Sequence, residues 1–259
     1  MWSNRLIGSF VFIALTLPAA VLAQDIRADV RDAKPVVPSP AASPLTPEAR
    51  ADIFMARKMY REAVETYLET KPPTAIVYNK VGIAYHQMSD LDTARKYYER
   101  SLKLNQKYAE AINNLGTIHY AKKNYRRAVS TYQRALKISP DSASMYSNLG
   151  TAYFARKDYK KATESYEKAM SIDPEVFESR GSHGVLLQER SVTERAKFHY
   201  YLAKTYAKAG RTELALLYIR KSLEEGFKER KKYMQDAEFE TIRTLPEFDD
   251  LMKLEPRVL

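Results

Sequence analysis

The sequence predicts an all-α fold in which pairs of helices stack side by side, and three regularities support this prediction. Gly82, Gly116 and Gly150 recur at intervals of 34 residues. An alanine follows each glycine after 12 residues, and a tyrosine follows each alanine after four. Because one helix pair cannot bury its own apolar face, a fixed period of this length is typical of stacked repeats, which form a long concave surface suited to binding.

The residue types at the repeated positions fit the packing of two helices. After the glycines come Ala94, Ala128 and Ala162, and then Tyr98, Tyr132 and Tyr166. We expect the glycine of the first helix to meet the alanine of the second, where bulk is excluded, and the tyrosine to fill space between neighbouring units. Pro140 and Pro174 end two of the units, because proline has no amide N–H with which to continue a helix.

This pattern resembles the tetratricopeptide repeat (TPR) family, whose unit is a helix–turn–helix of 34 residues with small, aromatic and proline positions at these offsets. The resemblance is specific for residues 75–176, and weaker flanking copies extend it to roughly three quarters of the chain. It implies a right-handed α-solenoid of about five helix pairs, in which the first helix of each pair lines a concave groove.

The first 23 residues have the pattern of a secretory signal peptide. Arg5 is their one charged residue, an apolar run covers residues 6–17, and small side chains lie around Ala23. We expect cleavage after Ala23 and export, to the periplasm or beyond. Because a membrane span needs about 20 apolar residues, an uncleaved inner-membrane anchor is the alternative. Without cysteine, a lipid anchor of the bacterial lipoprotein type is excluded.

Residues 24–47 carry five prolines among alanine, serine and valine and show no helical period. We predict a disordered linker here, which serves either as a tether or as a trimmed tail.

The helical units follow in order over residues 48–225. In the first unit, Phe54, Ala63 and Tyr67 copy the spacing of the aromatic, alanine and tyrosine of the next one. The predicted units are 48–74, 75–108, 109–142, 143–176 and 196–226.

A 19-residue insertion, 177–195, separates the last two units. Gly184 lies one period after Gly150, but a unit in that register would run a helix through Gly210. We therefore expect the fifth unit to begin at Ala196. Insertions in solenoids commonly emerge on one face and often carry binding.

Residues 226–259 are predicted to form a helical cap over the last unit. Gly226 is suited to end a helix. Asp236 can begin a short helix that bears Phe239 and Ile242, and Pro246 can begin another that bears Phe248, Leu251 and Met252.

The resemblance places eleven side chains in the groove, where asparagine amides can pair with a peptide backbone and aromatic rings supply an apolar floor. They are Asn79, Ile83, His86, Asn113, Asn114, Thr117, Tyr120, Ser147, Asn148, Thr151 and Phe154. The alternative is that Asn114 and Asn148 only satisfy backbone groups between units.

The turns inside two units repeat a cationic pattern, which predicts a basic ridge along one edge of the stack. Its residues are Lys122, Lys123, Arg126, Arg127, Arg156, Lys157, Lys160 and Lys161. The chain as a whole has 42 basic and 32 acidic residues and a net charge of +10. Such a ridge suits an acidic partner or an anionic envelope lipid, or it is a solvated face that aids solubility.

Other functions find little support in the sequence. Chaperone-binding TPR domains grip a terminal carboxylate with lysine, asparagine and arginine, but only Asn114 agrees among Asn79, Ile83, Asn114, Ser144 and Asn148. We find no phosphate-binding glycine loop, no metal-ligand spacing and no nucleic-acid motif, and we expect no cofactor. His119 occupies an aromatic position of its unit, which favours a structural role.

We therefore predict a non-enzymatic scaffold of the bacterial cell envelope that binds a peptide or helix of a partner protein in its groove. One alternative is an envelope-surface module that docks to anionic lipid or polymer through the basic ridge. Another is an enzyme or enzyme accessory that uses Ser182, His183 and Glu189 of the insertion.

Overall fold

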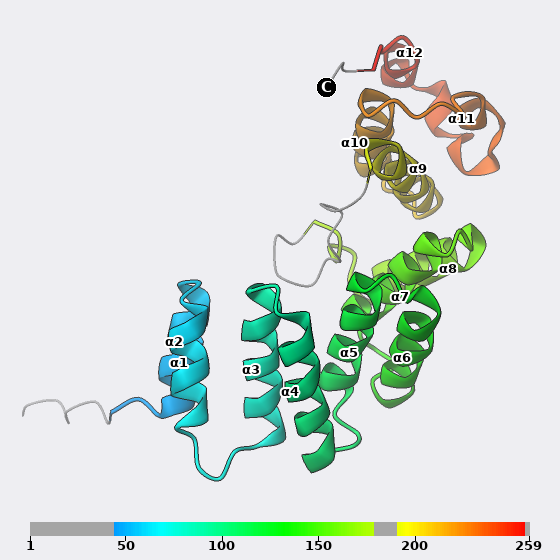
Figure 1. Cartoon of the computed structure of the whole chain (residues 1–259). Coiled ribbons are helices and arrows are strands. Elements are labelled where there is room, and N and C mark those ends of the chain that lie inside the picture. Colours follow the sequence, from blue (N-terminus) through cyan, green and yellow to red (C-terminus); the bar gives the residue numbers. More distant parts are fainter. Residues whose placement is uncertain (1–43, 179–190, 257–259) are drawn as a thin grey trace, which may run out of the picture. The chain divides into compact units, whose positions relative to one another are not determined.

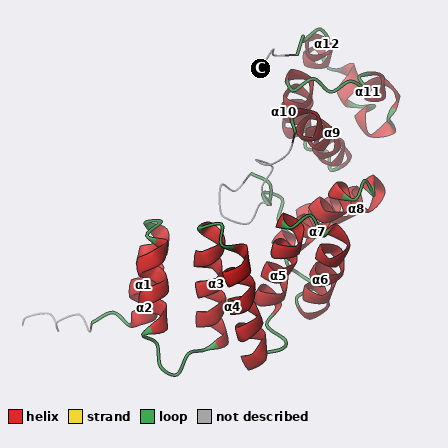
Figure 2. Ribbon diagram, viewed as in Figure 1, coloured by secondary structure: helices red, strands yellow, loops and turns green. Residues whose placement is uncertain are grey.

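The structure is a computed structural model that describes residues 44–178 and 191–256. These residues form twelve α-helices and two short 3-10 helices and contain no strand (Figure 2). The predicted all-α fold of paired helices is confirmed. The signal and nearly all of the linker lie outside the described residues, as do residues 179–190 of the insertion. No helix of the described part is long and apolar enough to cross a membrane.

Ten of the helices form five consecutive pairs, each joined by a short turn (Figure 1). The pairs are α1 (Pro47–Ala56) with α2 (Tyr60–Leu68), α3 (Ala75–Gln87) with α4 (Leu91–Leu104), α5 (Ala109–Ala121) with α6 (Tyr125–Ile138), α7 (Ala143–Ala155) with α8 (Tyr159–Ile172), and α9 (Val192–Lys208) with α10 (Thr212–Glu224). Helix α9 begins at Val192, so the last four residues of the predicted insertion are helical.

The turns inside the pairs share one construction. In the α5–α6 turn, Lys123 has a φ of 58°, and the amides of Lys123 and Asn124 each donate to a carbonyl of α5 at 2.8 Å. These two bonds satisfy carbonyl groups that a helix end otherwise leaves without partners. The Asn124 side chain then accepts from the amide of Arg127 and begins α6. The α7–α8 turn repeats this with Lys157 and Asp158.

The repeated glycines lie against the tyrosine of their own pair. A Cβ atom at Gly116 would stand 2.6 Å from a ring carbon of Tyr132, and one at Gly82 would stand 2.5 Å from Tyr98. The three nearest atoms at Gly82 and Gly116 all belong to the tyrosine ring, so the expectation that the glycine meets alanine is wrong there. Both rings are fully buried, so the absent glycine side chain makes room for them. At Gly150 two of the three nearest atoms belong to Tyr166 and the third is the backbone oxygen of Ala162, at 3.1 Å.

The C-terminal segment continues the core of the last pair. It comprises α11 (Lys231–Gln235), η2 (Ala237–Phe239), η3 (Ile242–Thr244) and α12 (Pro246–Met252). Its buried side chains join one core cluster with α9 and α10; they are Tyr233, Phe239, Ile242, Phe248 and Leu251. Helix α10 ends before Gly226, whose φ of 81° only glycine adopts readily.

Two details of this segment differ from the prediction. Phe239 and Ile242 lie in two separate 3-10 turns and not in one helix. Asp236 caps neither turn, since its carboxylate accepts hydrogen bonds from the Tyr200 hydroxyl and from Lys204 Nζ, the latter at 2.9 Å. These contacts fix the segment to α9.

Candidate partner-binding surface

Four asparagine side chains form a chain of hydrogen bonds across three first helices. Asn114 of α5 donates to Asn79 Oδ1 of α3 at 2.9 Å, and Asn148 of α7 donates to Asn113 Oδ1 of α5 at 3.1 Å. Within α5, Asn113 donates to Asn114 Oδ1 at 3.5 Å. We call these four residues the amide ladder. Its amides bond side chains of the neighbouring unit, so the alternative that Asn114 and Asn148 serve backbone groups is wrong.

Charged groups take the place of the ladder between α1 and α3. Lys80 stands one 34-residue period before Asn114, and its Nζ lies 2.7 Å from Glu48 Oε1 and 2.8 Å from Asp52 Oδ2. Sequence reasoning missed this ion pair. The repeat register was the signal that could have found it, because Lys80 occupies the position of the donor amides.

Aromatic rings replace the ladder between the fourth and fifth pairs. Tyr201 of α9 stacks on Tyr159 of α8, with ring centroids 4.8 Å apart and planes 11° apart. Phe154 of α7 meets Phe198 and Tyr201 edge-on, at 5.5 and 5.9 Å. Lys197 Nζ lies 4.3 Å from the centroid of the Tyr159 ring. We call Phe154, Tyr159, Phe198 and Tyr201 the aromatic junction.

These contacts divide the eleven predicted groove residues into two groups. Those that are buried and closed to a ligand in this structure are Asn79, Ser147, Asn148, Thr151 and Phe154. Those that are half-buried are Ile83, His86, Asn113, Asn114, Thr117 and Tyr120. The second group comes from α3 and α5 alone, so any partner that uses the predicted groove residues meets mainly these two helices.

One buried tyrosine hydroxyl has no partner because of a change at a groove position. Tyr132 donates to Thr117 Oγ1 at 3.1 Å, and Tyr166 donates to Thr151 Oγ1 at 3.4 Å. Ile83 stands at the equivalent position of the second pair. Consequently the Tyr98 hydroxyl is buried without a hydrogen bond to any described residue. Burial raises the pKa of Tyr98, so this hydroxyl stays protonated.

Burial lowers the pKa of three histidines, which are therefore neutral at pH 7. In His86 burial is the whole cause. In His119 burial is the largest cause, and the cations of Arg127 and Arg95 add to it. In His199 burial outweighs the nearby Glu225 carboxylate, which lies 2.7 Å from Nδ1. The half-buried position of His119 fits the predicted structural role.

These histidines make the fold sensitive to acid. The unfolded chain binds protons at its histidines as the pH falls below about 6.5, whereas the folded chain resists binding them until the pH is lower. We therefore expect the free energy of unfolding, measured with urea, to fall between about pH 7 and pH 5.5. Changing His86, His119 and His199 together to glutamine should flatten this dependence. Equal or greater stability at the lower pH would contradict the assignment.

All eight residues of the predicted basic ridge are exposed, in the turns before α6 and α8 and in their first turns. Two of the eight have acidic partners: Lys122 pairs with Asp92 of α4, and Lys161 lies 3.6 Å from Asp158. The other six form no ion pair with a described carboxylate. Lys123 and Lys157 have positive φ angles, in the left-handed region. A side chain branched at Cβ would be strained in this conformation, so the turn itself favours an unbranched residue at these two positions.

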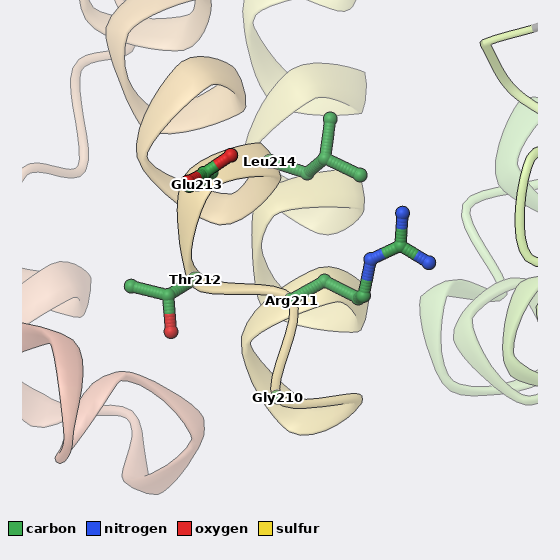
Figure 3. A pocket seen from close by; sticks show the side chains of 5 residues that line it. All are labelled: Gly210, Arg211, Thr212, Glu213 and Leu214. Atoms are coloured by element: carbon green, nitrogen blue, oxygen red, sulfur yellow. The ribbon is translucent and has the colours of Figure 1, made fainter.

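The remaining chemistry of the described residues is sparse. They contain no group of three or more acidic, histidine or cysteine side chains placed to hold a metal. A hollow of about 330 Å³ lies at the α9–α10 turn and is lined by Gly210, Arg211, Thr212, Glu213 and Leu214 (Figure 3). None of the predicted groove or ridge residues lines it. Ser182, His183 and Glu189 fall outside the described residues.

Comparisons with known proteins agree with this architecture. The family model described as "Tetratricopeptide repeat" matches residues 49–107 and 107–175. No curated protein matches the chain in sequence. Among solved structures, a chain of the APC/C hetero-tetramer Cut9-Hcn1 is 19% identical with a TM-score of 0.51, and the match covers 80% of this chain and 35% of that one.

Two smaller solved proteins are also similar. MamA is 23% identical with a TM-score of 0.46, over 71% of this chain and 96% of that one. YrrB, described as "a TPR protein with an unusual peptide-binding site", is 21% identical with a TM-score of 0.44, over 51% of this chain and 69% of that one.

Proposed function

Because the chain belongs to the tetratricopeptide repeat family through residues 49–175, we propose that it is a scaffold that holds a segment of a partner protein against α3 and α5. Proteins of this family are protein–protein interaction scaffolds and are typically not enzymes. The observation that carries the finer proposal is the group of half-buried side chains on these two helices, chiefly Ile83, His86 and Tyr120.

The contacts of this surface indicate how it would bind. Three of the four ladder oxygen atoms already accept from a ladder amide, and Asn79 and Asn148 are buried, which limits the access of a peptide backbone to the ladder. Ile83 and Tyr120 offer apolar area, and the Tyr120 ring packs against Tyr125 at a centroid distance of 5.3 Å. We therefore expect the partner to contribute apolar side chains, whose burial supplies most of the affinity.

We place this function in the bacterial cell envelope, in the periplasm or beyond. Support comes from the charge and apolar pattern of residues 1–23, which is that of a cleaved secretory signal. Fractionation of cells and sequencing of the mature N-terminus test this proposal, with cleavage after Ala23 as the expected result. Retention of the first residues in the membrane fraction would support the alternative, an inner-membrane anchor.

The groove proposal is tested by capture of the partner. The full chain, tagged at its C-terminus, is crosslinked in intact cells, and bound proteins are identified by mass spectrometry. We expect a variant with Ile83→Ala and Tyr120→Ala to lose the partner, with Kd raised at least about tenfold, because truncation of central anchors removes most of the binding energy. A variant with Lys157→Gln and Lys160→Gln serves as the control and should retain the partner.

A circular dichroism spectrum and a melting curve of both variants show whether they remain folded. Equal capture by folded groove and ridge variants would contradict binding at α3 and α5. Loss of capture in the ridge variant alone would place the protein contact at the basic ridge. The second candidate, docking of the basic ridge to anionic lipid or polymer, predicts instead that the full chain binds vesicles of anionic lipid and that the ridge variant does not. The six ridge cations without ion pairs support that candidate, whose binding should weaken with added salt because exposed charges are screened.

A further inference from the structure

Helix α6 carries cations and no acidic residue. Residues 122–137 hold six basic side chains and no carboxylate, whereas α4 contains Asp92 and Glu99, and α8 contains Glu164 and Glu167. The four cations of α6 itself are Arg126, Arg127, Arg134 and Lys137, and all of them are exposed. None forms an ion pair with a carboxylate of residues 44–178 or 191–256. We call this surface the α6 basic face.

The spacing of these cations aligns them along the helix. Residues seven and eleven apart return to nearly the same side of an α-helix, so Arg127 lies in line with Arg134, and Arg126 with Lys137. At 1.5 Å per residue, the face is about 16 Å long. Three arginines on it offer planar guanidinium groups, which bind carboxylates through two parallel hydrogen bonds.

The C-terminal segment presents the opposite charge. Residues 236–255 contain seven acidic and two basic side chains. Glu240, Glu247, Asp249 and Asp250 are exposed, and of these only Asp250 has a described cationic partner, Lys253 at 3.0 Å. We call these four residues the acidic face.

One of the two cations of this segment, Arg243, points inward. Arg243 donates to the backbone carbonyl oxygen atoms of Tyr233 at 3.3 Å and Asp236 at 2.9 Å. It therefore cannot neutralise the carboxylates on the outside. Because Phe248 and Leu251 of α12 are buried, the acidic side chains of the same helix are turned to the surface.

We propose that the α6 basic face of one molecule binds the acidic face of a second copy of this chain. Charge complementarity is the basis of the proposal: each face holds exposed charges of one sign, and of all these charges only Asp250 has an ion-pair partner among the described residues. The two faces differ, so the contact is head-to-tail, and a dimer keeps one free basic face on one molecule and one free acidic face on the other. Such contacts close into a ring or extend as an open chain. The proposal does not depend on binding at α3 and α5.

Exposed ion pairs are individually weak and are screened by salt, so the association should appear at high protein concentration and low ionic strength. Analytical ultracentrifugation of the mature chain should show a mass that rises with concentration in about 50 mM NaCl and returns to that of the monomer in about 500 mM NaCl. A monomer at every concentration in the low-salt buffer would overturn the proposal.

Charge reversal on each face identifies the contact. A variant with Arg126→Glu and Arg134→Glu, or one with Glu247→Lys and Asp249→Lys, should each weaken self-association at least about tenfold, because like charges then face one another. Mixing these two variants should restore a heterodimer, since the unaltered acidic face of the first complements the unaltered α6 basic face of the second, and the two reversed faces also complement each other. A control with Arg220→Glu and Lys228→Glu, at exposed positions outside both faces, changes the net charge by the same amount as the α6 variant and should associate as the unaltered chain does.

Three outcomes would overturn the assignment. One is loss of association in the control variant as complete as in the face variants, which would indicate a net-charge effect. Another is a mixture that stays monomeric while each variant remains folded by circular dichroism, which would exclude this pairing. The third is an unaltered chain that stays monomeric and binds vesicles of phosphatidylglycerol through Arg126 and Arg134, which would assign the basic face to a lipid surface.

Discussion

Replacing Gly116 by alanine is expected to lower the free energy of unfolding by up to about 2 kcal/mol, although alanine is the better helix former. The added methyl group would stand 2.6 Å from the ring of Tyr132, which is fully buried. Overpacking of this kind costs about 1–3 kcal/mol. The higher helix propensity of alanine offsets about 1 kcal/mol of that cost.

The sign of this effect should reverse when the ring is removed. In a chain that already carries Tyr132→Leu, the same Gly116→Ala change should raise the free energy of unfolding by up to about 1 kcal/mol, because only the propensity remains. Urea unfolding of the four variants of this double-mutant cycle measures both values. Destabilisation of equal size in the two backgrounds would show that the ring is not what excludes the methyl group.

Truncation of Asn113 to alanine is expected to cost about 2–3 kcal/mol, because this residue has a role in two bonds of the amide ladder. It accepts from Asn148 at 3.1 Å and donates to Asn114. Asn148 is buried, and its Oδ1 already has no hydrogen-bond partner among the described residues. Without the Asn113 side chain, the side-chain N–H of Asn148 loses its acceptor as well.

The interaction between Asn113 and Asn148 is measured by a second double-mutant cycle. Asn113→Ala and Asn148→Ala should together cost at least about 1 kcal/mol less than the sum of the single changes, since either one alone breaks the shared bond. Additive effects would show that the bond between α5 and α7 contributes nothing to stability. Asn105→Ala, at an exposed residue after α4, is a control that should leave the coupling unchanged.

The sequence predicts the helix pairs well because their signals are local and repeated. Pro140 and Pro174 mark ends of units, and Asn124 and Asp158 begin second helices at the same place in each period. The sequence identified the repeated glycines as close-packed positions, but it pointed to alanine as the neighbouring side chain, whereas the nearest side chain in the structure is tyrosine. Spacing along one chain indicates which residues recur, whereas the partner of each depends on how two helices are rotated against each other.

The groove residues show a similar limit. The resemblance supplied positions on the first helices, but it does not say which of them a neighbouring unit covers. Phe154 is buried because α9 brings Phe198 and Tyr201 against it, and the residue pattern before α9 does not follow the 34-residue period. The ion pair of Lys80 with Glu48 could have been predicted from the repeat register alone, since both residues occupy positions equivalent to those of the amide ladder.

The amide ladder also bears on the entropy of recognition. It joins α3, α5 and α7 side chain to side chain, and α3 and α5 are the helices that carry Ile83 and Tyr120. Helices held in this way are preorganised, and little of their conformational freedom remains to be lost when a ligand arrives. The entropic cost of complex formation then falls mainly on the incoming segment, so a partner segment that is already helical or otherwise rigid in solution would be favoured over a flexible one of the same composition.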